Sequence, residues 1–309
     1  MLNKQVRILN FDNSVKQQVN LLKKFRPSII DLAKIGPLAR LWSDNTTEKA
    51  IKAVLSADLK GAVSFLGSGD FHHISSILIE QFSEPITVIV FDAHPDWDIM
   101  PPKSGCGSWV TKILRMPNIE QVLLFGISSD DINTFNIQTA NLLSLKNDRL
   151  RIYPYSHAPT RVWLRRIPRN SSLKTENSIF GSTIFWEGLL NKELDVFLLE
   201  VLSGLRTRKV YISIDKDCLS SEYSMTNWEE GKLGLDMLLS MLKIIKDNCD
   251  ISGADITGDF SEIDIKSRIK SIFSALDHPK DYSAKGAATP LINSINENTN
   301  IKILELFLS

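Results

Sequence analysis

The feature that most constrains this chain is an apolar run, 86–91, that ends in Asp92-Ala93-His94-Pro95-Asp96. The run is rich in β-branched residues, which is typical of a strand buried on both faces of a parallel sheet. Alternate residues of an extended chain point to the same side, so Asp92, His94 and Asp96 can converge just beyond the strand. Such a group is costly to bury unless something neutralises it, and a divalent cation is therefore expected there.

Three other apolar runs end in polar residues of the same kinds. They lead into Gly67-Ser68-Gly69-Asp70-Phe71-His72-His73, into Asp215-Lys216-Asp217 and into Thr257-Gly258-Asp259. In open parallel α/β sheets, ligands bind beyond the carboxyl ends of the strands. We therefore expect the polar residues at these strand ends to meet in one site.

Helical patterns alternate with the strands along the chain. Apolar residues recur at helical spacing in 46–58, 72–81, 108–115, 189–205 and 233–245, and the tail 287–308 reads as one helix or two short pieces. Further strands are expected at 122–127 and 150–153. This alternation predicts an α/β fold, a three-layer α/β/α domain over residues 1–309 with a mainly parallel central sheet.

One segment, 154–182, breaks the alternation. It contains three prolines and the Ser/Asn run Asn170-Ser171-Ser172, and we interpret it as an irregular surface excursion within the domain. It also carries a local basic excess, Arg161-Val162-Trp163-Leu164-Arg165-Arg166, with Arg169 nearby. We interpret these arginines as part of a solvated loop, with an anion-binding patch as the alternative.

The composition excludes several classes of partner. The chain has 36 Lys and Arg against 36 Asp and Glu, so there is no bulk attraction to nucleic acid or to an anionic membrane. No apolar stretch approaches the roughly 20 residues of a membrane span, and three scattered cysteines favour a reducing compartment. We expect a cytoplasmic protein that acts on a small molecule, without a nucleic-acid or membrane partner; a homo-oligomer is left open.

The polar motifs also match those of a known superfamily. The run Asp92-Ala93-His94-Pro95-Asp96 matches a DAHxD motif, and Ser213-Ile214-Asp215-Lys216-Asp217 matches SxDxD. The run Ser68-Gly69-Asp70-Phe71-His72 is similar to GGDH with one residue inserted before the histidine. In this order, and over about residues 60–260, the chain resembles the arginase/agmatinase (ureohydrolase) superfamily. The resemblance implies a fold of the arginase/deacetylase type.

The number of candidate ligands indicates two metal ions rather than one. Four carboxylates and two imidazoles exceed the four ligands of a tetrahedral zinc, and an oxygen-rich set favours Mn²⁺, with Zn²⁺ or another divalent ion as the alternative. The resemblance implies that two manganese ions per chain are bound and that Asp96 also belongs to the catalytic group. The six ligands it assigns are His72, Asp92, His94, Asp96, Asp215 and Asp217.

The chain departs from the superfamily where the substrate is bound. Ser104-Gly105-Cys106-Gly107-Ser108-Trp109 stands in place of an SGNxHG loop and has no histidine. The position of the superfamily's guanidinium-binding glutamate falls at or beside Gly258, so Asp259 is the nearest carboxylate for a substrate. We predict a hydrolase that cleaves a non-peptide C–N bond (guanidino, amidine or amide) in a small cationic substrate, other than arginine, through a metal-bridging hydroxide.

Two alternatives to this function are kept. One is an amidohydrolase with a single zinc, similar to the acetylpolyamine and histone deacetylases, which use one Asp-His-Asp site and a pair of histidines. The other is a non-catalytic protein that retains the metal centre for stability. Among the neighbouring residues, Trp97 and Trp228 are expected to pack in the core, Asp98 to cap a loop and His73 to support the site, while a cation-binding role for Glu229 and Glu230 stays open.

Overall fold

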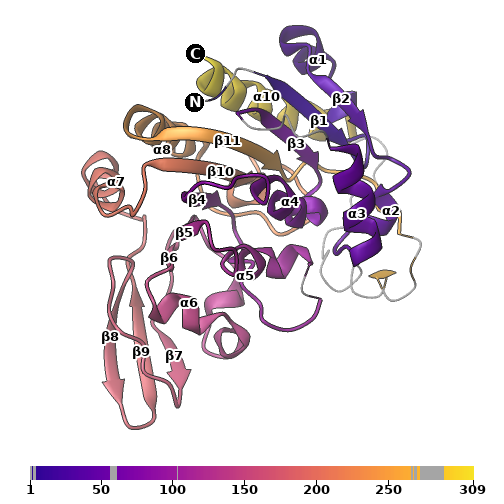
Figure 1. Ribbon diagram of the computed structural model, residues 1–309. Coiled ribbons are helices and arrows are strands. Elements are labelled where there is room, and N and C mark those ends of the chain that lie inside the picture. Colours follow the sequence, from indigo (N-terminus) through magenta and orange to yellow (C-terminus); the bar gives the residue numbers. More distant parts are fainter. Residues whose placement is uncertain are drawn as a thin grey trace.

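A single parallel sheet forms the centre of the molecule. The structure is a computed structural model of the 309-residue chain, and it describes residues 2, 5–55, 61–102, 104–265, 267, 270–271 and 289–309. Among these residues, eight strands pair in the order β2-β1-β3-β11-β10-β4-β5-β6, and every pairing is parallel (Figure 1). The strands are β1 (Val6–Asn10), β2 (Ser28–Asp31), β3 (Val63–Gly67), β4 (Ile86–Phe91), β5 (Ile119–Phe125), β6 (Leu150–Tyr153), β10 (Lys209–Asp215) and β11 (Asp250–Thr257).

Helices cover both faces of this sheet (Figure 1). One face packs against α2 (Gly36–Ala39), α3 (Asn45–Val54), α4 (Ser75–Ile79), α5 (Trp109–Ile113) and α6 (Leu142–Lys146). The other packs against α1 (Val19–Phe25), α7 (Leu194–Ser203), α8 (Leu235–Asn248) and α10 (Thr289–Leu308). Short 3₁₀ helices are η1 (Val15–Gln17), η2 (Gly69–Ile74), η3 (Cys106–Ser108), η4 (Asp130–Ile132), η5 (Asn136–Thr139) and η6 (Lys216–Cys218).

The central strand β4 is mainly apolar because both of its faces are buried. In β4, Val88 and Val90 belong to the core on one side of the sheet, whereas Ile89 and Phe91 belong to the core on the other. This arrangement explains the mainly apolar run that the sequence shows at 86–91. The predicted three-layer α/β architecture is confirmed.

The segment predicted to be irregular is folded. The segment and the four residues after it form a small antiparallel sheet in the order β7-β9-β8, with β7 at Thr160–Trp163, β8 at Leu173–Ser178 and β9 at Gly181–Trp186. Its inward side chains, Val162, Leu173 and Ile184, join the core on the side of α6. Alternation in strands of four to six residues is too short a signal to stand out beside the prolines. Figure 1 shows this sheet projecting from the lower end of the molecule.

Two further strands were not predicted. β1 and β2 form the edge of the main sheet beside β3, and β2 is largely exposed. Within the described ranges, every helix is too short or too polar to cross a lipid bilayer.

Candidate metal centre

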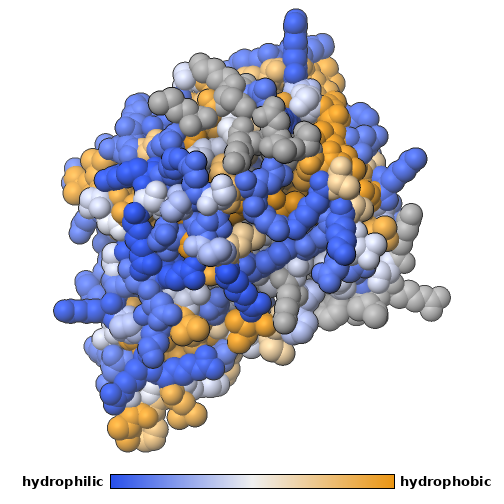
Figure 2. All heavy atoms as spheres, viewed as in Figure 1, coloured by the Kyte–Doolittle hydropathy of each residue, from blue (hydrophilic) through white to orange (hydrophobic). Residues whose placement is uncertain are grey.

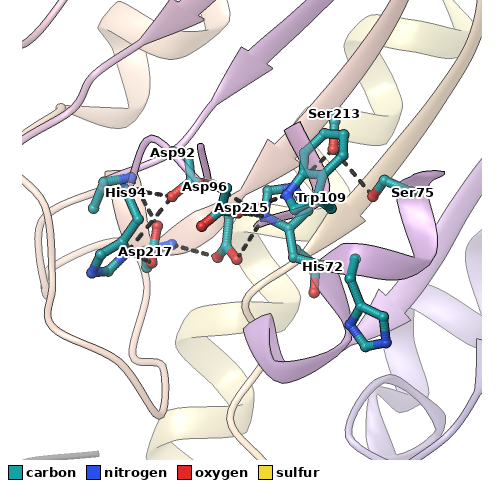
Figure 3. Close-up of polar contacts among 12 residues, drawn as sticks. His72, Ser75, Asp92, His94, Asp96, Trp109, Ser213, Asp215 and Asp217 are labelled. Atoms are coloured by element: carbon teal, nitrogen blue, oxygen red, sulfur yellow. Dashed lines mark hydrogen bonds and ion pairs between the residues drawn. The ribbon is translucent and has the colours of Figure 1, made fainter. Parts of the chain in front are cut away.

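Adjacent strand ends bring the candidate ligands together (Figure 3). Ile214 of β10 pairs with Phe91 of β4, so the next residues, Asp215 and Asp92, lie at the same edge of the sheet. His72 reaches this edge from η2, which follows β3. The strands β3, β11, β10 and β4 are consecutive in the sheet, which explains why their carboxyl ends meet.

The ligands form two groups that share one carboxylate. In the first, His72 Nδ1 lies 3.0 Å from Asp92 Oδ2, 3.2 Å from Asp96 Oδ2 and 3.5 Å from Asp215 Oδ2. In the second, His94 Nδ1 lies 2.9 Å from Asp217 Oδ2 and 3.7 Å from Asp92 Oδ1. The two oxygens of Asp92 thus face different groups, and either group could hold a metal ion.

Hydrogen bonds fix which nitrogen of His72 faces the carboxylates. His72 Nε2 is 2.9 Å from Ser213 Oγ, and the Ser213 hydroxyl donates to Asp255 Oδ1 at 2.7 Å. Ser75 and Tyr211 donate to the same buried carboxylate. Because the Ser213 proton goes to Asp255, Ser213 Oγ accepts the Nε2 proton of His72. A neutral His72 then directs its Nδ1 lone pair at carboxylate oxygens.

This orientation fits a cation between the imidazole and the carboxylates. A lone pair that faces carboxylate oxygens at 3.0–3.5 Å is repelled unless positive charge lies between them. Asp92 Oδ2 is buried and receives no hydrogen bond, although His72 Nδ1 is near. Buried acceptors without donors are rare, and a metal ion would satisfy this one. Two divalent ions would also balance the four negative charges of the ligand set.

The pKa values of the candidate ligands also indicate that the site favours added positive charge. Burial, reinforced by the Asp92 carboxylate, raises the pKa of Asp96 to about 8. Burial and the neighbouring Asp217 raise the pKa of Asp215 well above its ordinary value. Burial lowers the pKa of His72 and His94, but nearby carboxylates outweigh it and raise both well above the ordinary value. Without another cation, protons neutralise the site.

An indole holds the least regular of the ligands in place. Asp96 has a positive φ of 47°, a conformation that aspartate tolerates better than most residues. Trp109 Nε1, at the start of α5, donates to Asp96 Oδ2 at 2.6 Å. The same ring packs on His72, with 4.7 Å between ring centroids. Trp109 therefore orients two ligands at once.

Two glycines allow the backbone to approach Asp215 closely. Gly258 follows β11 with a φ of +84°, and a Cβ built on it would overlap Asp215 Oδ1. A Cβ on Gly69 would lie 2.9 Å from Asp215 Oδ2. The superfamily's glutamate therefore has no counterpart at Gly258, because no side chain fits there.

A cavity of about 400 Å³ opens above the two groups, and all six expected ligands line it. Four more acidic residues form part of its wall: Asp98, Asp130, Asp131 and Glu229. Burial, with a contribution from the Asp131 carboxylate, raises the pKa of Asp98 to about 6. Among the described residues that line this cavity, there is no lysine or arginine. The wall is therefore suited to a cation.

An aromatic side chain completes the wall. Trp228 is half-buried, lines the cavity and packs edge-on against His94, with 5.5 Å between ring centroids. Its Nε1 donates to Asp70 Oδ1 at 3.0 Å, and Asp70 accepts a hydrogen bond from the buried Arg40. Trp97 also borders the cavity, but it is only 1% exposed and packs in the core, as expected.

Asp259 lies away from the expected substrate position. It is buried, and its carboxylate accepts hydrogen bonds from Gln18 at 2.7 Å, Lys216 at 2.8 Å and Asn300 at 3.1 Å. It is not among the residues that line the cavity. These bonds occupy its oxygens and argue against the substrate contact that the sequence suggested. Gln18 and Asn300 come from distant segments of the chain, so these contacts could not be predicted from the sequence.

Some of the remaining neighbouring residues line the cavity, and others lie behind it. His73 is buried, with Nε2 at 2.9 Å from Ser43 Oγ, and it does not line the cavity. Cys106 and Asp98 do line it, although Asp98 was expected only to cap a loop. The roles of Trp109 and Asp255 were not predicted, because the only indication of them in the sequence is their closeness to the motifs.

Comparisons with solved structures identify the fold. The chain superimposes on arginase from Bacillus caldovelox with a TM-score of 0.56 and 14% identity, over 99% of this chain and 98% of that one. It superimposes on agmatine ureohydrolase of Thermoplasma volcanium with a TM-score of 0.54 and 13% identity, over 98% and 87% of the two chains. The protein has the arginase fold. The predicted resemblance to the ureohydrolase superfamily is confirmed at the level of fold, with far divergence in sequence.

Two further comparisons also give low sequence identities. Proclavaminate amidino hydrolase from Streptomyces clavuligerus has a TM-score of 0.53 and 12% identity, over 99% of this chain and 92% of that one. A protein of Thermotoga maritima, described as uncharacterized, is 24% identical over 293 residues, or 93% of this chain and 95% of its own length. No family model matches the chain.

Proposed function

We propose that this arginase-fold protein is a divergent member of the ureohydrolase superfamily. In this proposal it is a dinuclear, manganese-preferring hydrolase that cleaves a non-peptide C–N bond in a small cationic substrate. The observation that carries the proposal is the pair of ligand groups that share Asp92 at the floor of the cavity. When bound, two divalent ions would supply Lewis acidity and activate water for attack on a trigonal carbon.

The protein's own residues supply binding and orientation. Asp92 directs one oxygen to each group, and the bond to Ser213 presents His72 through Nδ1. His72, Asp92, Asp96 and Asp215 would hold one ion, and His94, Asp217 and the shared Asp92 the other. Trp109 fixes Asp96, so the ligands are arranged before an ion arrives.

The cavity wall favours a substrate with positive charge and no carboxylate. Asp98, Asp130, Asp131 and Glu229 attract cations, and the described lining offers no basic side chain for a carboxylate. A planar guanidinium or amidinium could stack on the half-buried face of Trp228. The solved structures of the same fold include agmatine ureohydrolase and an amidino hydrolase. We therefore favour an amine that carries a guanidine, amidine or amide, and not arginine.

A single-zinc amidohydrolase is the second candidate. The group of Asp92, His94 and Asp217 has the Asp-His-Asp composition that this alternative requires. The pair of histidines that this alternative also requires is less well matched in this protein. His72 lies among the carboxylates, and His73 does not line the cavity. The dinuclear proposal uses His72 as a ligand and leaves His73 as a supporting residue.

Metal counting and a substrate screen test the proposal together. Protein dialysed against manganese should contain close to two ions per chain by plasma emission. His72→Ala and His94→Ala should each lose about one ion, whereas Asp98→Asn, a matched change in the cavity wall, should keep both. Agmatine, other guanidino and amidino amines and acetylated diamines are then assayed beside arginine.

Three outcomes would redirect the assignment. One zinc ion per chain, with cleavage of acetylated amines, would favour the mononuclear alternative. Two ions without turnover of any compound would favour the non-catalytic alternative. Rapid release of urea from arginine would contradict the substrate part of the proposal, because the described lining has no basic side chain to pair with the arginine carboxylate.

A further inference from the structure

The outer end of the β7-β9-β8 sheet carries exposed apolar side chains. Leu164 is 84% exposed, Ile179 81% and Phe180 62%. Ile179 and Phe180 form the two-residue turn between β8 and β9, because Ser178 pairs with Gly181. The Leu164 amide donates to the Phe180 carbonyl at 2.9 Å, which holds the two parts together. We refer to Leu164, Ile179 and Phe180 as the apolar tip.

The apolar surface extends beside this tip. Trp163 is 45% exposed and packs edge-on against Phe135, which is 74% exposed, with 6.0 Å between ring centroids. Figure 2 shows hydrophobic side chains gathered at the lower end of the molecule, where Figure 1 places the small sheet. Single exposed apolar residues are common, but a cluster of them on one projecting element marks an interaction surface.

Positive charge predominates in the segment that carries the apolar tip. Residues 160–186 contain five basic residues and one acidic residue, a net charge of +4 in a chain whose formal net charge is zero. Within the described part of the chain, none of the four arginines forms an ion pair, and Lys174 pairs with Glu187 at 3.1 Å. All five basic residues are exposed: Arg161, Arg165, Arg166, Arg169 and Lys174.

We propose that this tip docks the protein reversibly onto an anionic membrane surface. Leu164, Ile179 and Phe180 would enter the boundary between lipid headgroups and acyl chains, while the arginines bind lipid phosphates. Opposite charge selects this occupant, because the segment is strongly basic although the chain as a whole is neutral. Docking of this kind requires no helix that spans the bilayer.

Other partners fit the tip less well. Two copies that met through the tip about a two-fold axis would bring the same arginines face to face. Single-stranded nucleic acid is bound by planar side chains on which bases stack, whereas the two most exposed tip residues, Leu164 and Ile179, are aliphatic.

The sequence alone gives no sign of this surface. Its apolar residues are separated by the β8 strand and become neighbours only through the pairing of β7 with β9. The sequence-based expectation of no membrane partner considered only spanning segments and bulk charge. The arginines belong to the run for which an anion-binding patch was the alternative interpretation.

Co-sedimentation of the full-length protein with vesicles tests the proposal. The wild type should bind vesicles of phosphatidylcholine with phosphatidylserine at low salt, and binding should fall at high salt and with phosphatidylcholine alone. Arg165→Gln with Arg166→Gln should weaken binding about fivefold for each arginine removed. Leu164→Ser with Phe180→Ser should weaken it about tenfold or more.

Matched variants elsewhere on the surface serve as controls. Leu199→Ser removes an exposed leucine of α7, and Lys23→Gln with Lys49→Gln removes two exposed charges; neither should change binding. Thermal unfolding and metal content verify that every variant is folded. Failure of the wild type to bind, equal binding to neutral vesicles, or equal loss in the controls would overturn the proposal. So would a tip-dependent dimer, or RNA binding with the same dependence on the tip, in the absence of vesicle binding.

Discussion

At the scale of single residues, the site is defined by which atoms face inward. Asp92 is central because its two oxygens face different ligand groups. His72 is useful as a ligand because Ser213 and Asp255 hold its other nitrogen. Residues that touch no ion thus decide whether the ligands are ready for one.

Trp109→Phe tests this supporting role. The change keeps an aromatic ring on His72 but removes the indole proton that Asp96 accepts. We expect manganese to bind about 10–100-fold more weakly at the His72 group, while the His94 group is unchanged. Isothermal titration calorimetry of the metal-free protein with manganese measures binding at both groups.

Trp186→Phe provides the control for that experiment. It removes an indole hydrogen bond of similar length, to Thr160 Oγ1 at 2.9 Å, in the small sheet. If both variants bind manganese like the wild type, Trp109 does not orient Asp96 for metal binding.

At the scale of elements, the sequence predicts the strand ends better than it predicts what supports them. The runs before Asp92 and Asp215 are mainly apolar because β4 and β10 are covered on both faces, so the strands and their polar ends could be predicted from the sequence. Asp259 could not be placed, because Gln18 and Asn300 reach it only in the folded chain. The small sheet was missed for the same reason, since its strands are stabilised by packing against the core.

Gly258→Ala tests the close packing of two strand ends. The residue has a φ of +84°, which costs an L-residue about 1–2 kcal/mol, and the new methyl group would displace Asp215 Oδ1. We expect lower stability in urea denaturation and loss of manganese from the His72 group. Gly234→Ala, where no described atom lies within 4 Å of the added Cβ, should keep manganese at the His72 group and lose less stability, because only the N-cap of α8 is changed.

At the scale of the whole molecule, one buried carboxylate joins distant parts of the chain. Asp259 binds Gln18 beside α1, Lys216 after β10 and Asn300 of α10. Lys216 and Asp259 are almost fully buried, so neither charge can be solvated by water if its partner is lost. Through Gln18, Asn300 and Lys216, Asp259 therefore holds segments near both ends of the sequence against the strand end that carries Asp215 and Asp217.

Asp259→Asn should mainly lower the stability of the fold. The amide has the same shape but leaves the Lys216 charge without a counterion, and breaking a buried pair in this way costs about 3–5 kcal/mol. We expect the free energy of unfolding to fall by that amount in urea denaturation. Addition of Lys216→Met should restore much of it, because no charge is then left unpaired. An unchanged free energy of unfolding in the single variant would contradict this account of the pair.

Metal removal should reverse the pH dependence of stability. In the metal-free protein, the carboxylates raise the pKa of His72 and His94 well above the ordinary 6.5, despite burial. The folded state then holds more protons than the unfolded state, so these groups stabilise the metal-free protein below pH 6.5 and lose that effect as the pH rises through their raised pKa values.

Manganese must displace the same protons, so its affinity should rise with pH over that range. At a free concentration of 100 times the dissociation constant, each ion would stabilise the fold by about 2.7 kcal/mol. The free energy of unfolding is measured by urea denaturation, with manganese and with a chelator, between about pH 6 and 8, where an ordinary histidine loses its proton. Its slopes against pH in the two conditions should therefore have opposite signs. Calorimetry in two buffers of different ionisation enthalpy should detect released protons. Binding without proton release, or parallel slopes, would show that the imidazoles are neutral before the metal binds.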